Sequence, residues 1–191
     1  AIMSEYKGFG QQIDQSLIAK AQTGDVIAME TIYKHYAKPC YLLAMRITAN
    51  PTASQDIVHE VFVKVIRKVS QFKANGNFAG WVRQIAVNES IDFIKRNTRI
   101  HEQVEFNDEI ETTGYFESQW WDTIKDLDKL TSRLSDNARA VLFLHELEGL
   151  SHKEIAALFG KTESFSKQSL SRALNQLKNM SAIKEISNAS H

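Results

Sequence analysis

The stretch between Asn75 and Arg96 reads as a helix that carries an unusual strip of polar side chains. At 100° per residue its apolar residues form two roughly opposite faces, one around Phe78 and Val82 and the other around Ile91. Between these faces lie amide and amine groups with an indole at the edge: Gln84, Asn88, Lys95 and Trp81. Amides can bind base edges, amines can bind phosphates, and an indole can stack on a base. For Trp81, a place in the hydrophobic core is an equally open alternative.

A second polar set lies near the C-terminal end of the chain. Ser151 and Glu154 have capping-box spacing, Gly160 supplies a turn, and a longer helix begins near Ser164. Its predicted open face consists of Lys167, Gln168, Ser171, Arg172 and Asn175. Arg and Gln pair with base edges, whereas Lys and Ser reach phosphates. The pattern predicts a helix-turn-helix over about residues 151–177; a plain helical hairpin with a solvated face is the alternative.

A third set is acidic and lies on the helix predicted to begin around Asn50, Pro51 and Thr52. Its open side carries Gln55, Asp56, His59 and Glu60. Two acids four residues apart repel slightly unless a cation satisfies them, which favours a basic partner helix. The alternative is a solvated helix start, where acids suit the helix dipole.

The elements that hold these sets are all predicted to be helices. The chain has 191 residues, 43% of them hydrophobic, with only eight Gly and two Pro, and helical spacing recurs throughout. Helices are expected over 14–23, from Asp25 onward with a kink or restart at Pro39, and over 50–72. In the C-terminal part, a helix should begin at Ser135 and end at Gly149. The core-facing side of the last helix is predicted to consist of Phe165, Leu170, Ala173, Leu174 and Leu177.

Charge is unevenly distributed although the formal net charge is zero. Residues 64–99 carry a net charge of +6, residues 101–126 carry −7, and residues 161–184 carry +4. Chance patchiness on a solvated surface is one explanation, and two nucleic-acid-binding blocks around an acidic connector are the other. We therefore predict an all-α protein with two small helical domains, joined by a flexible acidic linker. The predicted parts are 12–100, the linker 101–126, 127–181 with the helix-turn-helix, and a tail 182–191.

Taken together, the three sets resemble a bacterial RNA polymerase sigma factor of the extracytoplasmic-function type, over about Ser16 to Lys178. "ASQDIVHEVFVKV" looks like the segment that docks on the clamp helices of the polymerase β′ subunit. "FAGWVRQIAVNESIDFIKR" looks like the segment that melts and reads the −10 element. "LSDNARAVLFLHELEGLSHKEIAALFGKTESFSKQSLSRAL" looks like the domain that reads −35 duplex. The order and spacing of the three segments carry the resemblance.

The resemblance implies roles for residues and for partners. Core polymerase would be bound by Gln55, Asp56, His59, Glu60 and Phe62. The −10 element would be bound by Lys73, Asn75, Asn77, Phe78, Trp81, Gln84, Asn88, Lys95 and Arg96, with the turn 73–78 forming a pocket for a flipped base. The −35 duplex would be bound by Ser164, Lys167, Gln168, Ser171, Arg172 and Asn175. The implied partners are core polymerase through its β′ clamp helices and β flap, promoter DNA, and a dedicated anti-sigma factor.

Four positions depart from the family pattern. His59 stands where Gln is usual, Ser164 and Ser166 replace a usual Gly and an apolar residue, and Ser169 replaces a frequent Arg. The second domain is therefore expected to dock differently on the −35 duplex or to bind it more weakly.

Other classes of function find little support. The His-Glu pairs in "HEVFVK" and "HELEG" do not continue to a second His at the fourth position, and there is no Gly-rich phosphate loop, so we expect no enzyme, cofactor or metal. A single cysteine, Cys40, fits packing and a reducing cytoplasm, and no apolar run approaches ~18 residues, so no membrane insertion is expected. Two alternatives stay open. One is a conventional helix-turn-helix regulator that binds duplex without polymerase, and the other is an adaptor that binds only proteins.

Overall fold

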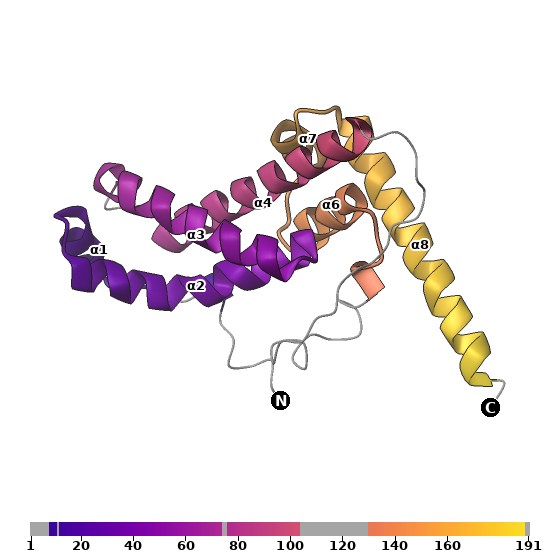
Figure 1. The fold of residues 1–191 in the computed structure, drawn as a ribbon, viewed down its shortest axis with the longest axis horizontal. Helices are drawn as coiled ribbons and strands as arrows, with labels where there is room; N and C mark the ends of the chain where they lie inside the picture. Colours follow the sequence, from indigo (N-terminus) through magenta and orange to yellow (C-terminus); the bar gives the residue numbers. More distant parts are fainter. Residues whose placement is uncertain (1–7, 11, 74–75, 104–129, 190–191) are drawn as a thin grey trace. The chain divides into compact units, whose positions relative to one another are not determined.

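The chain is helical in every part that the structure describes. The structure is a computed structural model that describes residues 8–10, 12–73, 76–103 and 130–189 (Figure 1). All regular elements in these ranges are α-helices or 3-10 helices, which confirms the predicted all-α class. The predicted acidic linker lies mostly outside the described residues, although the helix before it continues to Gln103.

Two compact units can be distinguished, and each is described by itself. The first consists of Ala1–Met45 and Pro51–Ser90, and the second of Arg46–Asn50 and Ile91–His191. Two long helices, α2 (Val26–Thr48) and α4 (Phe78–Gln103), contribute residues to both. The predicted domain limits therefore stay predictions, since this division by contacts cuts through helices rather than between them.

The first unit combines long helices with short, well-capped starts. Besides α2 and α4, it contains η2 (Gly8–Gly10), α1 (Gln15–Gln22), α3 (Pro51–Lys68) and η3 (Val69–Gln71). Asp14 caps α1 by accepting a hydrogen bond from the Ser16 amide at 3.0 Å. Figure 1 shows α2 and α3 running beside each other over much of their length. The predicted start of α3 at Pro51 is confirmed.

The sequence predicted either a kink or a restart of the second helix at Pro39, and the restart is not observed. α2 continues through Pro39, which lies on a buried part of the helix beside fully buried Cys40 and Tyr36. Proline removes one backbone donor, but burial of the surrounding apolar face keeps the helix continuous. Burial also raises the pKa of the Cys40 thiol to about 12, consistent with a packing role for this residue.

An aromatic cluster forms the centre of the first unit. The Tyr36 ring is fully buried with its centroid 6.0 Å from that of Phe78, and burial raises the pKa of its hydroxyl to about 12. Phe72 meets Phe78 edge-on at 5.1 Å, and Trp81 lies 5.3 Å from Phe72 and 5.4 Å from Phe78. Such tilted and edge-to-face pairs are favourable arrangements for aromatic rings. The start of α4 is therefore fixed to α2 and to the segment that follows η3.

A buried ion pair joins α3 to α4. The Glu89 side chain is 8% exposed and pairs with Lys64, whose side chain is 40% exposed. Burying a carboxylate without a partner costs free energy of folding, so burial of Glu89 depends on its ion pair with Lys64. The sequence alone did not distinguish Glu89 from the solvated acids.

The second unit contains three helices with clear start and stop signals. They are α6 (Asp136–Glu146), α7 (His152–Phe159) and α8 (Glu163–Ala189). Ser135 caps α6, and Ser151 with Glu154 forms a complete capping box on α7, as predicted. Gly160 ends α7 with a φ of 63°, the left-handed conformation that glycine adopts without strain. α6 stops at Glu146, three residues before the expected end at Gly149, whose φ is 70°.

The core of the second unit lies between α6 and α8. It is made of Leu134, Ala138, Leu142 and Ala173, with Leu170 and Leu177 half-buried against it. The predicted inward stripe of α8 is confirmed for these α8 residues but wrong for Leu174, which is 41% exposed. Ala173 and Leu174 are neighbours, so they point about 100° apart, and only one of them can face the core. α8 continues as one long helix through most of the segment predicted as a tail (Figure 1).

A histidine pair links the ends of the three helices. The rings of His145 and His152 are stacked with centroids 4.4 Å apart. His145 donates from Nδ1 to the carbonyl of Leu150 at 2.9 Å, and His152 Nδ1 lies 2.9 Å from Ser166 Oγ. Ser166 is fully buried on α8. The hydroxyl that departs from the family's apolar residue therefore has a polar partner on α7 that satisfies it.

This pair should make the second unit less stable in acid. The pKa of His152 is lowered from 6.5, first by burial and then by the neighbouring charges of His145 and Lys167, which outweigh the opposite effect of Glu163. The folded unit thus favours neutral His152, so its contribution to stability is complete above about pH 6.5 and is lost as the pH falls below that. We expect the melting temperature to fall between about pH 7.5 and pH 5.5.

Thermal unfolding of the full chain, followed by circular dichroism at both pH values, measures this effect. His152→Gln should reduce the loss of melting temperature in acid, whereas the exposed His59→Gln should behave like the wild type. Equal pH dependence in the wild type and His152→Gln would contradict the assignment.

Candidate functional site

Two residues of the polar strip predicted on α4 are exposed. Gln84 and Asn88 are exposed, and Gln84 Nε2 donates to Asn88 Oδ1 at 3.1 Å. Both flanking faces are buried, as expected: one by Phe78, Val82 and Ala86, the other by Val87, Ile91 and Ile94. The amide pair is thus the part of this stretch that can reach a ligand without moving the core.

Cations continue the strip toward the end of α4. Lys95 is half-buried and pairs with Asp92, one helical turn earlier, at 3.2 Å. Arg96 is exposed. The two cations follow Gln84 and Asn88 along one continuous helix.

Hydrogen bonds hold Gly76 and Asn77, the two residues that directly precede α4. Asn77 is exposed, and its side-chain oxygen accepts a hydrogen bond from the Gly80 amide at 2.9 Å, so it caps the helix. The Gly76 amide donates to the Lys73 carbonyl at 2.9 Å. A Cβ on Gly76 would lie 3.0 Å from Phe72 Cζ and 3.1 Å from that carbonyl oxygen. Lys73 is exposed, and the predicted site residue Asn75 lies outside the described residues.

The two aromatic residues of the predicted −10 set occupy different environments. Phe78 is buried and packs against Trp81, so its ring offers no open face. Its predicted contact with DNA stays a prediction, and one that would require its ring to emerge. Trp81 is half-buried, with one part against Phe72 and Phe78. The core and stacking interpretations of Trp81 are therefore compatible, because its ring packs and is still partly accessible.

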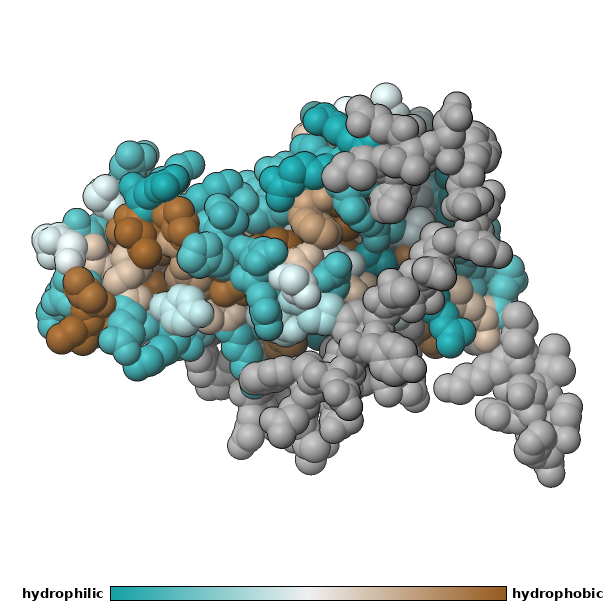
Figure 2. All heavy atoms as spheres, in the orientation of Figure 1, coloured by the Kyte–Doolittle hydropathy of each residue, from teal (hydrophilic) through white to brown (hydrophobic). Residues whose placement is uncertain are grey.

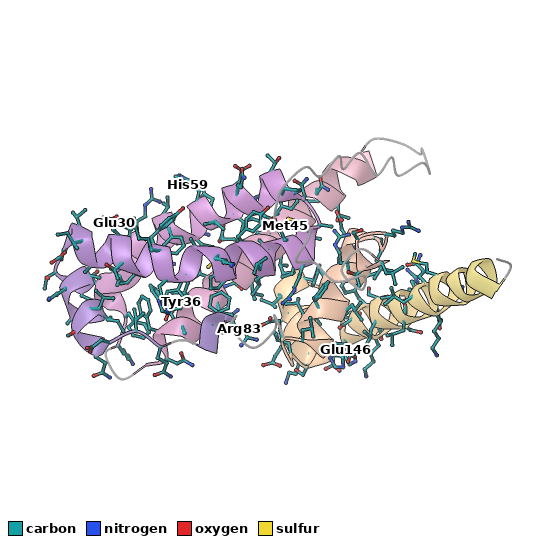
Figure 3. The ribbon with its side chains drawn as sticks, turned by 90° about the horizontal axis from the view of Figure 1, so that it is seen from below. Glu30, Tyr36, Met45, His59, Arg83 and Glu146 are labelled. Carbon is teal, nitrogen blue, oxygen red and sulfur yellow. The ribbon has the colours of Figure 1, made fainter. Side chains whose placement is uncertain are left out.

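The acidic set lies along the outer side of α3. Gln55, Asp56, His59 and Glu60 are all exposed, and Figure 3 shows His59 at the outer edge of its helix. Phe62, predicted with them, is buried and meets Tyr33 edge-on at 4.7 Å. Figure 2 shows hydrophobic residues on the surface of the first unit, and the exposed apolar residues there include Tyr33 and Ile66. A partner on α3 would meet an acidic face bordered by apolar side chains.

The open face predicted on α8 is exposed throughout. It comprises Ser164, Lys167, Gln168, Ser171, Arg172 and Asn175. Lys167 lies 3.8 Å from Glu163 in a solvated pair, which holds the side chain only weakly. Ser169, which replaces a frequent Arg of the family pattern, is buried. α8 therefore presents two long hydrogen-bonding side chains, Gln168 and Arg172, four residues apart on one side.

Two residues that matter for these surfaces were not identified from the sequence. Gln22 donates from α1 to carbonyls 47 and 50 residues away, and His152 contacts Ser166 across 14 residues. Neither partner is visible in a local pattern, because each contact is made only when distant segments fold together. For the His152–Ser166 contact, the signal in the sequence was that serines replace the usual residues of the family at positions 166 and 169.

Other kinds of site find no support among the described residues. In that part of the chain, His, Cys, Asp and Glu do not gather in threes in a way that could hold a metal ion. Among the same residues, no helix has both the length and the apolarity needed to cross a membrane.

Two models of known protein families match this chain, one in its N-terminal part and one in its C-terminal part. The model of Sigma-70 region 2 matches residues 32–100, and the model of Sigma-70, region 4 matches residues 124–177. Together they include all three exposed faces. This pairing does not favour the alternative of a conventional regulator that binds duplex without polymerase.

Relatives and a solved structure agree with these matches. The ECF RNA polymerase sigma factor SigE of Mycolicibacterium smegmatis is 29% identical over 82% of this chain, which spans 63% of that protein's length. RNA polymerase sigma factor YlaC of Bacillus subtilis is 26% identical over 83% of this chain and 95% of its own. The structure of CnrH, solved with the cytosolic domain of CnrY, shares the fold with a TM-score of 0.50 at 19% identity, covering 89% of this chain and 97% of that one.

Two family models in the expected order, with relatives that match most of the chain, leave one assignment. The chain belongs to the sigma-70 family of bacterial RNA polymerase sigma factors, in its extracytoplasmic-function group.

Proposed function

We propose that this chain binds core RNA polymerase and directs promoter-specific initiation of transcription. The observation that carries the proposal is the exposed Gln84–Asn88 strip on a helix whose two other faces are buried. Such a strip has no role in holding the fold, and its chemistry fits unpaired bases. Membership of the sigma family supports the same function.

Strand opening has to be driven by binding. Unstacking a base step costs a few kcal/mol, and the sequence contains no Gly-rich loop for a nucleotide triphosphate. Stacking on an aromatic side chain contributes ~1–3 kcal/mol per base, which is of the size required. In this proposal Trp81 stacks, Gln84 and Asn88 hold base edges, and Lys95 and Arg96 hold phosphates. The turn 73–78 receives a flipped base.

The second unit reads duplex DNA in the same proposal. α8 enters the major groove at the −35 element, and the capping box on α7 and the turn at Gly160 set its entry angle. Gln168 and Arg172 reach base edges, while Lys167, Ser164, Ser171 and Asn175 contact phosphates or neighbouring edges. The buried Ser169 cannot replace the missing Arg contact, so −35 binding is expected to be weaker than in relatives that carry Arg there.

Protein partners complete the proposal. The acidic face of α3 docks on basic clamp helices of the polymerase β′ subunit, and the second unit contacts the β flap. A dedicated anti-sigma factor would cover the same faces and withhold the chain from polymerase. The protein acts as an initiation factor in the cytoplasm, not as an enzyme.

Run-off transcription tests the function directly. Purified core polymerase is combined with this protein on genomic promoter fragments, and transcripts are mapped. We expect discrete start sites that core alone does not use. If no fragment gives a specific transcript above the level of core alone, the proposed function is wrong.

Charge reversal on α3 should weaken core binding without unfolding the chain. Asp56→Arg or Glu60→Arg places a cation where the proposed partner is basic, and both residues are exposed. Affinity for core, measured by fluorescence anisotropy of labelled protein, should fall by at least about tenfold. Glu146→Arg, an exposed acid on α6 outside the proposed clamp-binding face, serves as the control and should bind like the wild type. A folded Asp56→Arg protein with unchanged affinity would count against this face.

The two DNA-reading surfaces should fail at different steps. Arg172→Ala or Gln168→Ala should reduce promoter affinity by ~1–3 kcal/mol and relax preference at one −35 position. Asn88→Ala and Trp81→Ala should leave the closed complex nearly intact and reduce opening, because the bases they hold are paired until melting.

Permanganate reactivity of unpaired thymines measures opening, and filter binding measures promoter affinity. A promoter already mismatched at −10 should restore the Asn88 and Trp81 variants but not the −35 variants. Wild-type opening of duplex promoter by Asn88→Ala would show that the α4 strip does not capture the strand.

A further inference from the structure

The segment between η3 and α4 is anchored from an unexpected direction. Gln22, the last residue of α1, is half-buried, and its Nε2 donates to the carbonyl of Val69 at 3.0 Å and to that of Phe72 at 2.7 Å. An amide nitrogen has two hydrogens, so both of its donors are used on these two carbonyls. Gln22 lies ahead of the region 2 match, which begins at residue 32.

The Phe72 carbonyl receives its hydrogen bond from outside its own segment. η3 ends at Phe72, whose φ of −67° and ψ of 129° are extended, so the chain leaves the helix there. The Val69 carbonyl accepts from the Phe72 amide at 3.1 Å as well as from Gln22, and the Phe72 carbonyl accepts from Gln22 at 2.7 Å. A half-buried carbonyl left without a partner is costly, so the Gln22 amide stabilises this exit.

The Phe72 ring contacts the start of α4 and lies close to Gly76. Its ring packs edge-on against Phe78 and at 5.3 Å from Trp81, on the far side of the turn. The same ring approaches Gly76 so closely that a Cβ there would be 3.0 Å from Phe72 Cζ. The position of Phe72 is therefore coupled to the positions of Gly76 and of the Trp81 ring.

We propose that Gln22 is a positioning residue for strand capture, which fixes Phe72 through two backbone carbonyls and thereby positions Gly76 and Trp81 for an unpaired base. The proposal rests on the proposed function for the meaning of that surface. α1 thereby has a part in −10 recognition without contacting DNA.

The first test uses the free full-length chain. Gln22→Met keeps the length and helix propensity of the side chain but removes both donors, and Gln12→Met, at an exposed position before α1, is the matched control. Hydrogen exchange of the Phe72 and Gly76 amides, measured by NMR, should be at least about tenfold faster in Gln22→Met, equivalent to about 1.4 kcal/mol. Gln22→Lys, which restores a multiple donor, should return exchange toward the wild type. Wild-type exchange in Gln22→Met overturns the positioning role.

The second test uses holoenzyme on a promoter found by the run-off experiment. Gln22→Met should bind core and form the closed complex like the wild type, yet open the duplex at least about tenfold less, measured by permanganate. A residue that merely stabilised the unit would lower core binding as well, so equal losses in binding and opening overturn the inference. Full opening by Gln22→Met also overturns it.

The two tests separate this inference from the function on which it rests. If wild-type protein gives no specific transcript, the proposed function fails, and the exchange experiment alone still decides whether Gln22 positions the turn. If wild-type protein initiates and Gln22→Met opens promoters equally well, only the inference fails.

Discussion

The first unit depends on one constraint, the burial of α4 on two faces at once. Val82 and Val87 are five positions apart, so they point in very different directions around the helix, yet both are buried. Each buried aliphatic side chain contributes about 1.5–3 kcal/mol, which makes exposure of either face unfavourable. The exposed amides Gln84 and Asn88 are consequently restricted to a narrow strip, and the two buried faces determine the direction in which that strip points. The orientation of Gln84 and Asn88 is thus decided by residues that never meet a ligand.

The same constraint explains the polar residues inside the unit. Glu89 falls just outside the strip and is buried, so it must be paired, and Lys64 on α3 supplies the charge. α3 is thereby tied to α4 through an ion pair as well as through apolar contacts. Asp56 on α3 and the amide pair Gln84 and Asn88 on α4 therefore belong to the same compact unit.

What the sequence could predict was local. The capping box of Ser151 and Glu154, the cap at Ser135 and the two apolar faces of α4 follow from spacing within one element, and all are confirmed. The prediction that Leu174 faces the core was wrong, because periodicity does not decide which of two adjacent apolar residues faces a small core. Phe78 was assigned both to the core and to the DNA surface, and its burial supports the first assignment. The Gln22 contacts could not be predicted, because a glutamine at a helix end has no pattern that points to a carbonyl 50 residues away.

The close approach at Gly76 sets a limit on how this protein could be redesigned. A library that seeks new promoter preferences would naturally vary the turn before α4. Any side chain at position 76 would press on the Phe72 ring and on the Lys73 carbonyl, and the carbonyl cannot move without its backbone. Asn77 is likewise committed to capping the helix. Diversity is therefore better placed at Lys73, Gln84 and Asn88, where side chains are exposed and substitution leaves the scaffold intact.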